Sequence, residues 1–243
     1  MRRIGMLGGM SWESTAEYYR FANQLVRERM GGVHSARLLI DTVDFADIES
    51  LQENGDWGAA GEILSARAQA LEAAGAELLV LCTNTMHKVA DRIEAAVAIP
   101  LIHIADATAA AIQDCGFSQV ALLGTRFTME QGFYRDRLAA FGIRTLIPGP
   151  GDREVIHRVI YEELVRGVIR DESRAAYTRI IESLQVAGAE AVVLGCTEIE
   201  LLISDEDSPI PTFPTTQIHI CSAIDQAFAR DVQPRRQEGS ASR

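Results

Sequence analysis

The stretch GAELLVLCTNT, residues 75–85, is echoed late in the chain by GAEAVVLGCTE, residues 188–198. Each copy has a Gly that ends a helix, a short apolar run, and a Cys-Thr pair followed by a polar residue. A continuous apolar run rich in Val and Leu is typical of a strand buried on both faces of a sheet. Each Cys-Thr pair therefore falls just past the carboxyl end of a strand, where open α/β sheets bind ligands.

Around these two stretches, predicted strands and helices alternate, which is typical of parallel sheets. A strand also runs into a Gly-containing turn early in each half, at residues 7–9 and 123–125. We therefore predict an α/β fold of two similar doubly wound parallel-sheet lobes, with the active site in the cleft between them. One continuous Rossmann-like domain is the alternative.

Breaks near Pro100 and Pro209 indicate where the chain crosses between the lobes. We predict the first lobe at residues 1–98 plus 210–230, because the last helix would return to it, and the second lobe at residues 99–209. Residues 231–243 are polar and lack periodicity, so a disordered tail is expected there.

Composition narrows the classes of function. The chain has 243 residues, of which 47% are hydrophobic and 23% charged, as expected for a globular protein with a sizeable core. Its formal net charge of −11 argues against nucleic acid or an anionic membrane surface as a partner. An anionic small molecule would have to be held by local donors, because the overall field repels it.

The start of the chain, MRRIG, lacks the apolar segment of a secretory signal, and no apolar run approaches membrane-spanning length. We therefore expect a cytoplasmic protein with no membrane partner. The cysteines contain no Cys-x-x-Cys pair, so neither a metal site nor a redox motif is indicated, and free thiols are expected. They are Cys82, Cys115, Cys196 and Cys221.

Cysteine is a modest acid, with an unperturbed pKa of roughly 8.5. A helix N-terminus lowers that pKa, and Cys82 and Cys196 each precede a predicted helix start. A thiolate on one side of a carbon and a thiol on the other could remove a proton and return one to the opposite face, which inverts a stereocentre. The alternative is that one or both cysteines are small buried hydrophobic residues.

Polar residues beside the two cysteines favour carboxylate binding. Thr83, Asn84 and Thr85 offer hydroxyls, an amide and backbone N–H groups at a helix start, and Thr197 and Glu198 offer an equivalent set. Helix N-capping is an alternative role for these side chains and is compatible with binding. The Gly8-Gly9 turn does not have the dinucleotide-binding spacing.

Histidine gives a weaker signal. His87 could pair with Cys82, but a separation of five residues along a helix favours a structural role. His103, His157 and His219 form no metal-ligand pattern with one another.

Several segments together resemble the aspartate/glutamate racemase family, which acts without pyridoxal phosphate. The similarity is strongest to the branch of aspartate/glutamate and broad-specificity amino-acid racemases, and it runs from about Arg3 to Phe228. The segments that carry it are LGGMSWEST (7–15), VDF (43–45), LCTNTMH (81–87), HIADAT (103–108), LGT (123–125) and GCTE (195–198).

This resemblance implies a two-lobed α/β fold, often dimeric, with Cys82 and Cys196 as opposed acid/base residues. It also implies which residues bind the substrate. The α-carboxylate and amino group would be held by polar residues of both lobes, Met10 and Gln52 would lie near the side chain, and Arg166 is a candidate for a distal carboxylate. The polar residues are Thr83, Asn84, Thr85, Thr125 and Thr197.

One residue departs from the family pattern. Many relatives have Asp where this chain has Pro214, and proline removes both that carboxylate and a backbone donor. The departure bears on the hydrogen bonding of the segment that returns to the first lobe.

The sequence therefore predicts a cofactor-independent amino-acid racemase that acts on aspartate or glutamate by thiolate/thiol proton transfer, as a homodimer. Two alternatives stay open. One is a related thiol-dependent decarboxylase or isomerase, and the other is a non-catalytic amino-acid-binding sensor.

Overall fold

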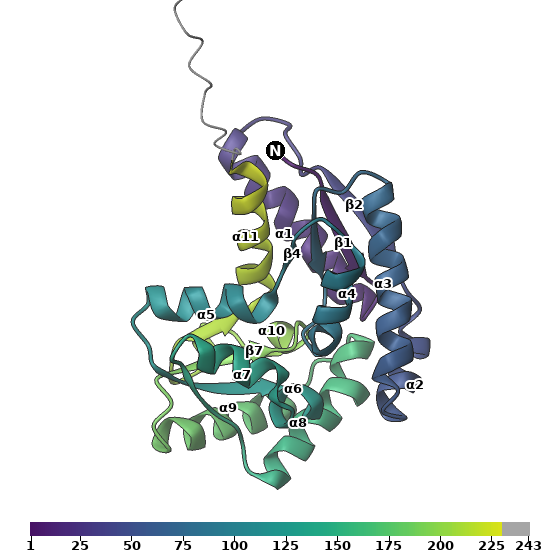
Figure 1. The fold of residues 1–243 in the computed structure, drawn as a ribbon. Coiled ribbons are helices and arrows are strands. Elements are labelled where there is room, and N and C mark those ends of the chain that lie inside the picture. The colour runs from purple at the N-terminus through teal and green to yellow at the C-terminus, as the bar shows by residue number, and fades with distance from the viewer. Residues whose placement is uncertain (230–243) are drawn as a thin grey trace, which may run out of the picture.

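The computed structural model describes residues 1–229, so residue 230 of the predicted first lobe and the predicted disordered tail at 231–243 lie outside the described residues. Two four-stranded sheets, parallel throughout, organise the described chain (Figure 1). The strands are β1 (Ile4–Gly8), β2 (Leu38–Thr42), β3 (Leu78–Leu81) and β4 (Leu101–Ile102) in the first sheet, and β5 (Gln119–Gly124), β6 (Arg144–Leu146), β7 (Ala191–Gly195) and β8 (Thr212–Pro214) in the second.

The strand order is the same in both sheets, β2-β1-β3-β4 and β6-β5-β7-β8. This repetition confirms the prediction of two similar α/β lobes, and the alternative of one continuous sheet is wrong. Strands β3 and β7, which precede the Cys-Thr pairs, are buried along their whole length, as their apolar runs predicted.

Helices connect the strands and cover both faces of each sheet (Figure 1). The predicted helix after Cys82 is divided into a 3-10 turn, η1 (Thr85–Val89), and the short α4 (Ala90–Ala96). The other helices are α1 (Trp12–Met30), α2 (Phe45–Glu53), α3 (Trp57–Ala73), α5 (Ile104–Asp114), α6 (Arg126–Glu130), α7 (Gly132–Ala140), α8 (Pro150–Glu162), η2 (Leu164–Arg166), α9 (Asp171–Val186), α10 (Ile199–Leu202), η3 (Asp205–Asp207) and α11 (Thr215–Phe228).

The predicted boundaries at residues 98/99 and 209/210 each fall a few residues too early. Strand β4 pairs with β3 of the first sheet, and β8 pairs with β7 of the second. Pro100 directly precedes β4, and Pro211, two residues after the predicted break at Pro209, directly precedes β8. Proline has no N–H to donate, but its carbonyl can still accept a hydrogen bond from the neighbouring strand. The Pro100 carbonyl accepts from Leu79 at 2.8 Å, and the Pro211 carbonyl accepts from Val192 at 2.9 Å. The chain therefore crosses over after β4 and again after β8.

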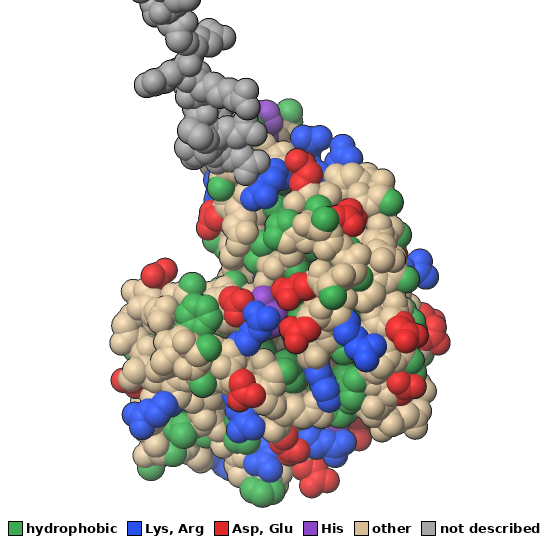
Figure 2. All heavy atoms as spheres, in the orientation of Figure 1, with side chains coloured by type: hydrophobic (Ala, Val, Ile, Leu, Met, Phe, Trp, Pro, Cys, Tyr) green, Lys and Arg blue, Asp and Glu red, His purple; other side chains and the backbone are tan. Residues whose placement is uncertain are grey.

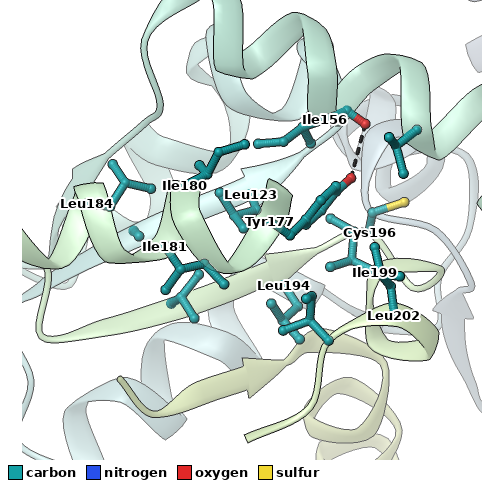
Figure 3. Close-up of a cluster of buried hydrophobic side chains, with 14 of the residues drawn as sticks. Leu123, Ile156, Tyr177, Ile180, Ile181, Leu184, Leu194, Cys196, Ile199 and Leu202 are labelled. Atoms are coloured by element: carbon teal, nitrogen blue, oxygen red, sulfur yellow. Dashed lines mark hydrogen bonds between the residues drawn. The ribbon is translucent and has the colours of Figure 1, made fainter. Parts of the chain in front are cut away.

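Apolar side chains alternate between the two faces of each sheet. In the first lobe, Leu78 and Val80 pack against α1 and α11, whereas Leu79 and Leu81 pack against α3. In the second lobe one face of the sheet packs against α5 and α7, and the other packs against α8 and α9. Figure 3 shows the α8/α9 core, in which the Tyr177 hydroxyl donates to the Ile156 carbonyl at 3.1 Å.

The start of α11 shows how the chain accommodates Pro214. No side chain of residue 214 caps the helix; instead the Glu200 carboxylate accepts from the Thr216 backbone N–H at 2.7 Å. The Thr215 hydroxyl donates to the Leu194 carbonyl at 2.8 Å, which ties the helix start to β7. Glu200 therefore supplies the carboxylate that the departure at 214 removes. From this point α11 runs back along α1 of the first lobe (Figure 1).

None of the helices within residues 1–229 combines the length and the apolar character needed to cross a membrane.

Candidate active site between the two lobes

A small cavity lies where the carboxyl ends of β3 and β7 meet. Its volume is about 20 Å³. Eight of the residues that the sequence singled out line it: Met10, Gln52, Thr83, Asn84, Thr85, Thr125, Cys196 and Thr197. Among the other lining residues, Glu198 was expected to take part in binding, and Phe45 and Gly195 belong to segments that carry the family resemblance. The remaining three are Ile160, Tyr161 and Val165.

Of the two predicted catalytic cysteines, Cys82 does not line this cavity. Its side chain is fully buried in the core between the first sheet, α1 and α11. Its thiol donates a long hydrogen bond to the Val80 carbonyl, at 4.0 Å. The structure therefore differs from the expectation that the two sulfur atoms face each other across one site.

Strand alternation explains this difference. Cys82 directly follows β3 and continues the face of Leu78 and Val80, whereas the second copy has an additional residue, Gly195, before its cysteine. Successive residues of a strand point to opposite faces, so one inserted residue moves the cysteine to the other side of the sheet. Cys196 accordingly lies on the α8/α9 side of its lobe, at the edge of the core in Figure 3.

Pairing between the strands gives the same correspondence. Leu7 pairs with Leu81 in the first sheet, and Leu123 pairs with Leu194 in the second. The residue after Leu81 is Cys82, and the residue after Leu194 is Gly195. By position in the fold, Cys82 thus corresponds to Gly195, and Thr83 corresponds to Cys196.

Glycine is needed at Gly195 itself. It pairs with Gly124, and a Cβ at Gly195 would lie 2.8 Å from the Leu123 carbonyl oxygen, while a Cβ at Gly124 would lie 2.7 Å from the Gly195 carbonyl oxygen. The two strand ends therefore approach more closely beside Cys196 than any larger residue would allow.

Burial raises the pKa of the Cys82 thiol, and burial together with the nearby Glu198 carboxylate raises the pKa of the Cys196 thiol. The expectation that helix N-termini would lower both values is wrong. The helical turn after Cys82 is a 3-10 segment and α10 after Cys196 has four residues, so their dipoles are too short to offset the desolvation of a thiolate.

Glu198 connects the groups around Cys196. One carboxylate oxygen accepts from the Cys196 thiol at 3.0 Å and from the Thr197 hydroxyl at 2.8 Å. The other accepts from the Ser11 hydroxyl of the first lobe at 2.5 Å. From the sequence, Glu198 was expected only to bind the substrate, and Ser11 stood out only as part of the LGGMSWEST segment. A carboxylate two residues after a cysteine is the signal that could have indicated a proton acceptor.

Hydroxyl and amide groups of both lobes meet on another wall of the cavity. The Thr85 and Thr125 hydroxyls lie 3.0 Å apart, and Asn84 donates through Nδ2 to the Thr215 hydroxyl at 3.0 Å. The Asn84 side-chain oxygen is buried and has no hydrogen-bond partner among the described residues. A buried acceptor without a donor is costly, so this oxygen is available for a donor on a bound ligand.

A second, larger cavity of about 550 Å³ adjoins the first, and we call it the vestibule. Gln52 of α2 and Tyr161 of α8 line both cavities, and the Tyr161 hydroxyl donates to the Gln52 side-chain oxygen at 3.1 Å. This hydrogen bond joins the two lobes between the vestibule and the inner cavity. Arg166 is exposed and lines neither cavity.

Three histidines form a buried cluster beside the site. The His87 ring lies 4.5 Å from that of His103 and 5.5 Å from that of His219. His87 donates through Nδ1 to the Thr83 carbonyl at 2.7 Å, because its Nε2 accepts from the Ile104 backbone at 3.2 Å. These two hydrogen bonds agree with the structural role expected for His87. They tie the loop that carries Thr83 to Ile104, at the start of α5, where the chain crosses to the second lobe.

The remaining predicted features lie elsewhere. A groove of about 580 Å³ between α1, α5 and α11 contains Cys221 but none of the predicted site residues, and it corresponds to the notch between the lobes in Figure 2. All four cysteines are free. Within residues 1–229, no three His, Cys, Asp or Glu side chains converge as a metal-binding group.

Two parallel-sheet lobes, with a Cys-Thr-Glu loop and a Thr-Asn-Thr loop that both line one cavity, define a class of two-lobed α/β proteins with a polar cavity at the lobe junction. The family model described as Asp/Glu/hydantoin racemase matches residues 7–223, and the chain belongs to this family. Racemases are isomerases, and the chain is an enzyme of that class.

Solved structures agree with this assignment. A protein described as a putative Asp/Glu racemase from Yersinia pestis is 52% identical, covers 94% of this chain and 100% of its own, and has a TM-score of 0.88. An aspartate racemase homologue from Pyrococcus horikoshii is 35% identical over 93% of this chain and 99% of its own, with a TM-score of 0.81. Among relatives found by sequence, the broad-specificity amino-acid racemase RacX of Bacillus subtilis is 24% identical over 58% of this chain and 60% of its own length.

Proposed function

We propose that the protein racemises an α-amino acid without a cofactor, by removing the α-proton on one face and returning a proton on the other. One observation supports this proposal: Thr83 and Cys196, which occupy equivalent positions after β3 and β7, both line a single cavity. The opposed groups would therefore be a hydroxyl and a thiol, and Cys82 would be a buried core residue.

Glu198 provides the base that this chemistry needs. The Cys196 thiol passes its proton to the Glu198 carboxylate, 3.0 Å away, and the resulting thiolate takes the α-proton of the substrate. The carbanion then takes a proton from the Thr83 hydroxyl on its other face. Solvent reprotonates Thr83 and Glu198 gives up its proton, so the reaction consumes and produces nothing except the change of handedness.

The same wall offers groups for the amino and carboxylate ends of the substrate. The unpartnered Asn84 oxygen suits a donor such as the α-ammonium group, and the Thr85 and Thr125 hydroxyls suit the carboxylate. A cavity of about 20 Å³ has room for about one water molecule, so the lobes must separate for an amino acid to enter. Closure would then exclude water from the reacting carbon.

Deuterium exchange at the α-carbon tests the proposal. The purified protein is incubated in D₂O with L- and D-amino acids and no added cofactor, and the products are separated by chiral chromatography. We expect deuterium at the α-carbon together with inversion. Binding without exchange would indicate a sensor, and loss of CO₂ would indicate a decarboxylase.

Four variants then separate the two acid/base schemes. Cys196→Ala and Thr83→Ala should each reduce turnover by about 100-fold or more, whereas Cys82→Ala should retain most of it. Cys115→Ala is the control, because Cys115 is exposed and lies in neither cavity. Loss of turnover in Cys82→Ala with normal turnover in Thr83→Ala would instead support the thiolate/thiol pair implied by the family resemblance.

The finer expectations stay predictions. Aspartate or glutamate is the substrate that the family resemblance implies. A homodimer and a cytoplasmic location are checked by light scattering of the purified protein and by fractionation of the cells that produce it.

A further inference from the structure

We propose that the substrate of this racemase has an uncharged side chain, in preference to the carboxylate of aspartate or glutamate. This inference rests on the proposed function, because it names the substrate class of the same cavity. It is carried by the residues that line the cavity apart from Thr125 and the loops at residues 83–85 and 195–198, and we call these residues the wall.

That wall is neutral. It consists of Met10, Phe45, Gln52, Ile160, Tyr161 and Val165. Among the residues of the 1–229 range that line the cavity, none is Lys, Arg or His, and the one ionisable carboxyl group is that of Glu198.

Nearby cations lie outside the cavity. Arg126 follows Thr125 directly, but its side chain is exposed and lines the vestibule, as does Arg153, which pairs with Glu130 at 2.8 Å. Arg166, the candidate for a distal carboxylate, is exposed and outside both cavities. A carboxylate on the substrate side chain would therefore be taken out of water without a cation, and it would share the cavity with Glu198. Burial of an unpaired charge is strongly unfavourable.

Gln52 can donate a hydrogen bond to an uncharged polar side chain while losing only a weak interaction of its own. Its Nε2 group donates to the Met86 sulfur at 3.0 Å, and a thioether is a weak acceptor. A hydroxyl or amide oxygen on the substrate would be a better acceptor for the same N–H. The Tyr161 hydroxyl, which now donates to Gln52, is a second neutral partner at the same place.

Substrate pairs of equal shape test the inference directly. Turnover is measured as kcat/KM for asparagine against aspartate and for glutamine against glutamate, with serine, alanine and lysine alongside. We expect each uncharged member to exceed its acidic counterpart by about 100-fold. Equal or greater turnover of the acidic members, or a preference for lysine, would overturn the inference.

A matched pair of variants tests whether the wall residues cause the preference for an uncharged side chain. Gln52→Lys places a cation there and should lower the asparagine-to-aspartate ratio by about 10-fold or more. Gln24→Lys makes the same change on the exposed side of α1 and should leave the ratio unchanged. If aspartate is turned over and Arg166→Gln abolishes that turnover, a surface cation reaches the substrate and the inference fails. If no amino acid exchanges its α-proton, the proposed function fails instead.

Discussion

At the scale of single residues, Glu198 decides whether Cys196 can act as a base. Burial and Glu198 itself raise the pKa of the thiol, so a thiolate forms only if a neighbour accepts the proton. The carboxylate is 3.0 Å from the sulfur and holds the Thr197 hydroxyl as well.

Glu198→Gln keeps the shape and the acceptor oxygen of this side chain but removes its capacity to take up a proton. We expect kcat/KM to fall by roughly 10²–10⁴-fold. Because the two enantiomers have equal free energies, the fall must be the same in both directions. Chiral turnover assays from each enantiomer measure it, and the exposed Glu206→Gln is the control. Turnover close to that of the parent protein would remove Glu198 from the proton path.

Residue types were more predictable from the sequence than their orientation. The motifs located the polar residues that line the cavity, since these follow strand ends directly. The side of the sheet on which each cysteine lies depends on the count from the strand end, and Gly195 changes that count by one. Alternation along a strand is therefore the step that would have separated Cys82 from Cys196.

At the scale of the helices, two buried groups at the start and first turns of α11 have pKa values that shift in opposite directions: Glu200, which belongs to α10, and His219, which belongs to α11. Burial raises the pKa of Glu200, which caps α11, to about 8. Burial lowers the pKa of His219 on α11 to about 4, with a partial offset from its hydrogen bond to the Ile102 carbonyl. Each shift links folding to pH.

For Glu200, the folded protein holds a proton more tightly than the unfolded chain, whose glutamate pKa is about 4.5. Stability from this group is therefore complete below pH 4.5 and is lost as the pH rises towards 8. Glu200→Gln keeps an oxygen that can accept from the start of α11, but it cannot ionise, so it should not lose stability as the pH rises. We expect its free energy of unfolding to exceed that of the parent protein by about 1–3 kcal/mol at pH 8.5 but not at pH 5. Urea unfolding at the two pH values measures the difference. A constant difference between them would contradict the assignment.

For His219, the unfolded chain binds protons more tightly, because its histidine pKa is about 6.5. Stability from the neutral ring is present above pH 6.5 and is lost as the pH falls through 4, with a loss of about 2 kcal/mol at pH 5. His219→Gln should unfold more easily at pH 7.5, since it disturbs the bonds to Tyr18 and Ile102, but should lose less on acidification. The exposed His34→Gln is the matched control variant.

The helices and strands themselves were largely predictable, because apolar runs and alternation are local. The ends of the lobes were not. Pro100 and Pro209 are strong breaks in the sequence, yet the strands after them complete each sheet through carbonyl groups that a pattern of side chains does not reveal. The histidine cluster joins residues far apart in the chain, so no spacing rule could have indicated it.

At the scale of the whole molecule, the contact between the lobes controls access to the reacting carbon. The inner cavity of about 20 Å³ cannot hold a substrate, whereas the vestibule of about 550 Å³ can. Between them lies the hydrogen bond from Tyr161 of α8 to Gln52 of α2. Its formation depends on how the two lobes sit together, which the sequence of neither helix determines.

Tyr161→Phe removes this hydrogen bond and keeps the ring. Burial raises the pKa of the Tyr161 hydroxyl, so the group is a proton donor in the parent protein and its loss weakens closure by about 1 kcal/mol. Because the closed form is the one that excludes water around the substrate, KM should rise up to about 5-fold, while the unfolding midpoint changes little. Tyr19→Phe, on the exposed side of α1, should leave KM unchanged. If the KM of Tyr161→Phe equals that of the parent protein, the lobes close without this hydrogen bond. Gln52 and Tyr161 would then only separate the two cavities, with no role in closure.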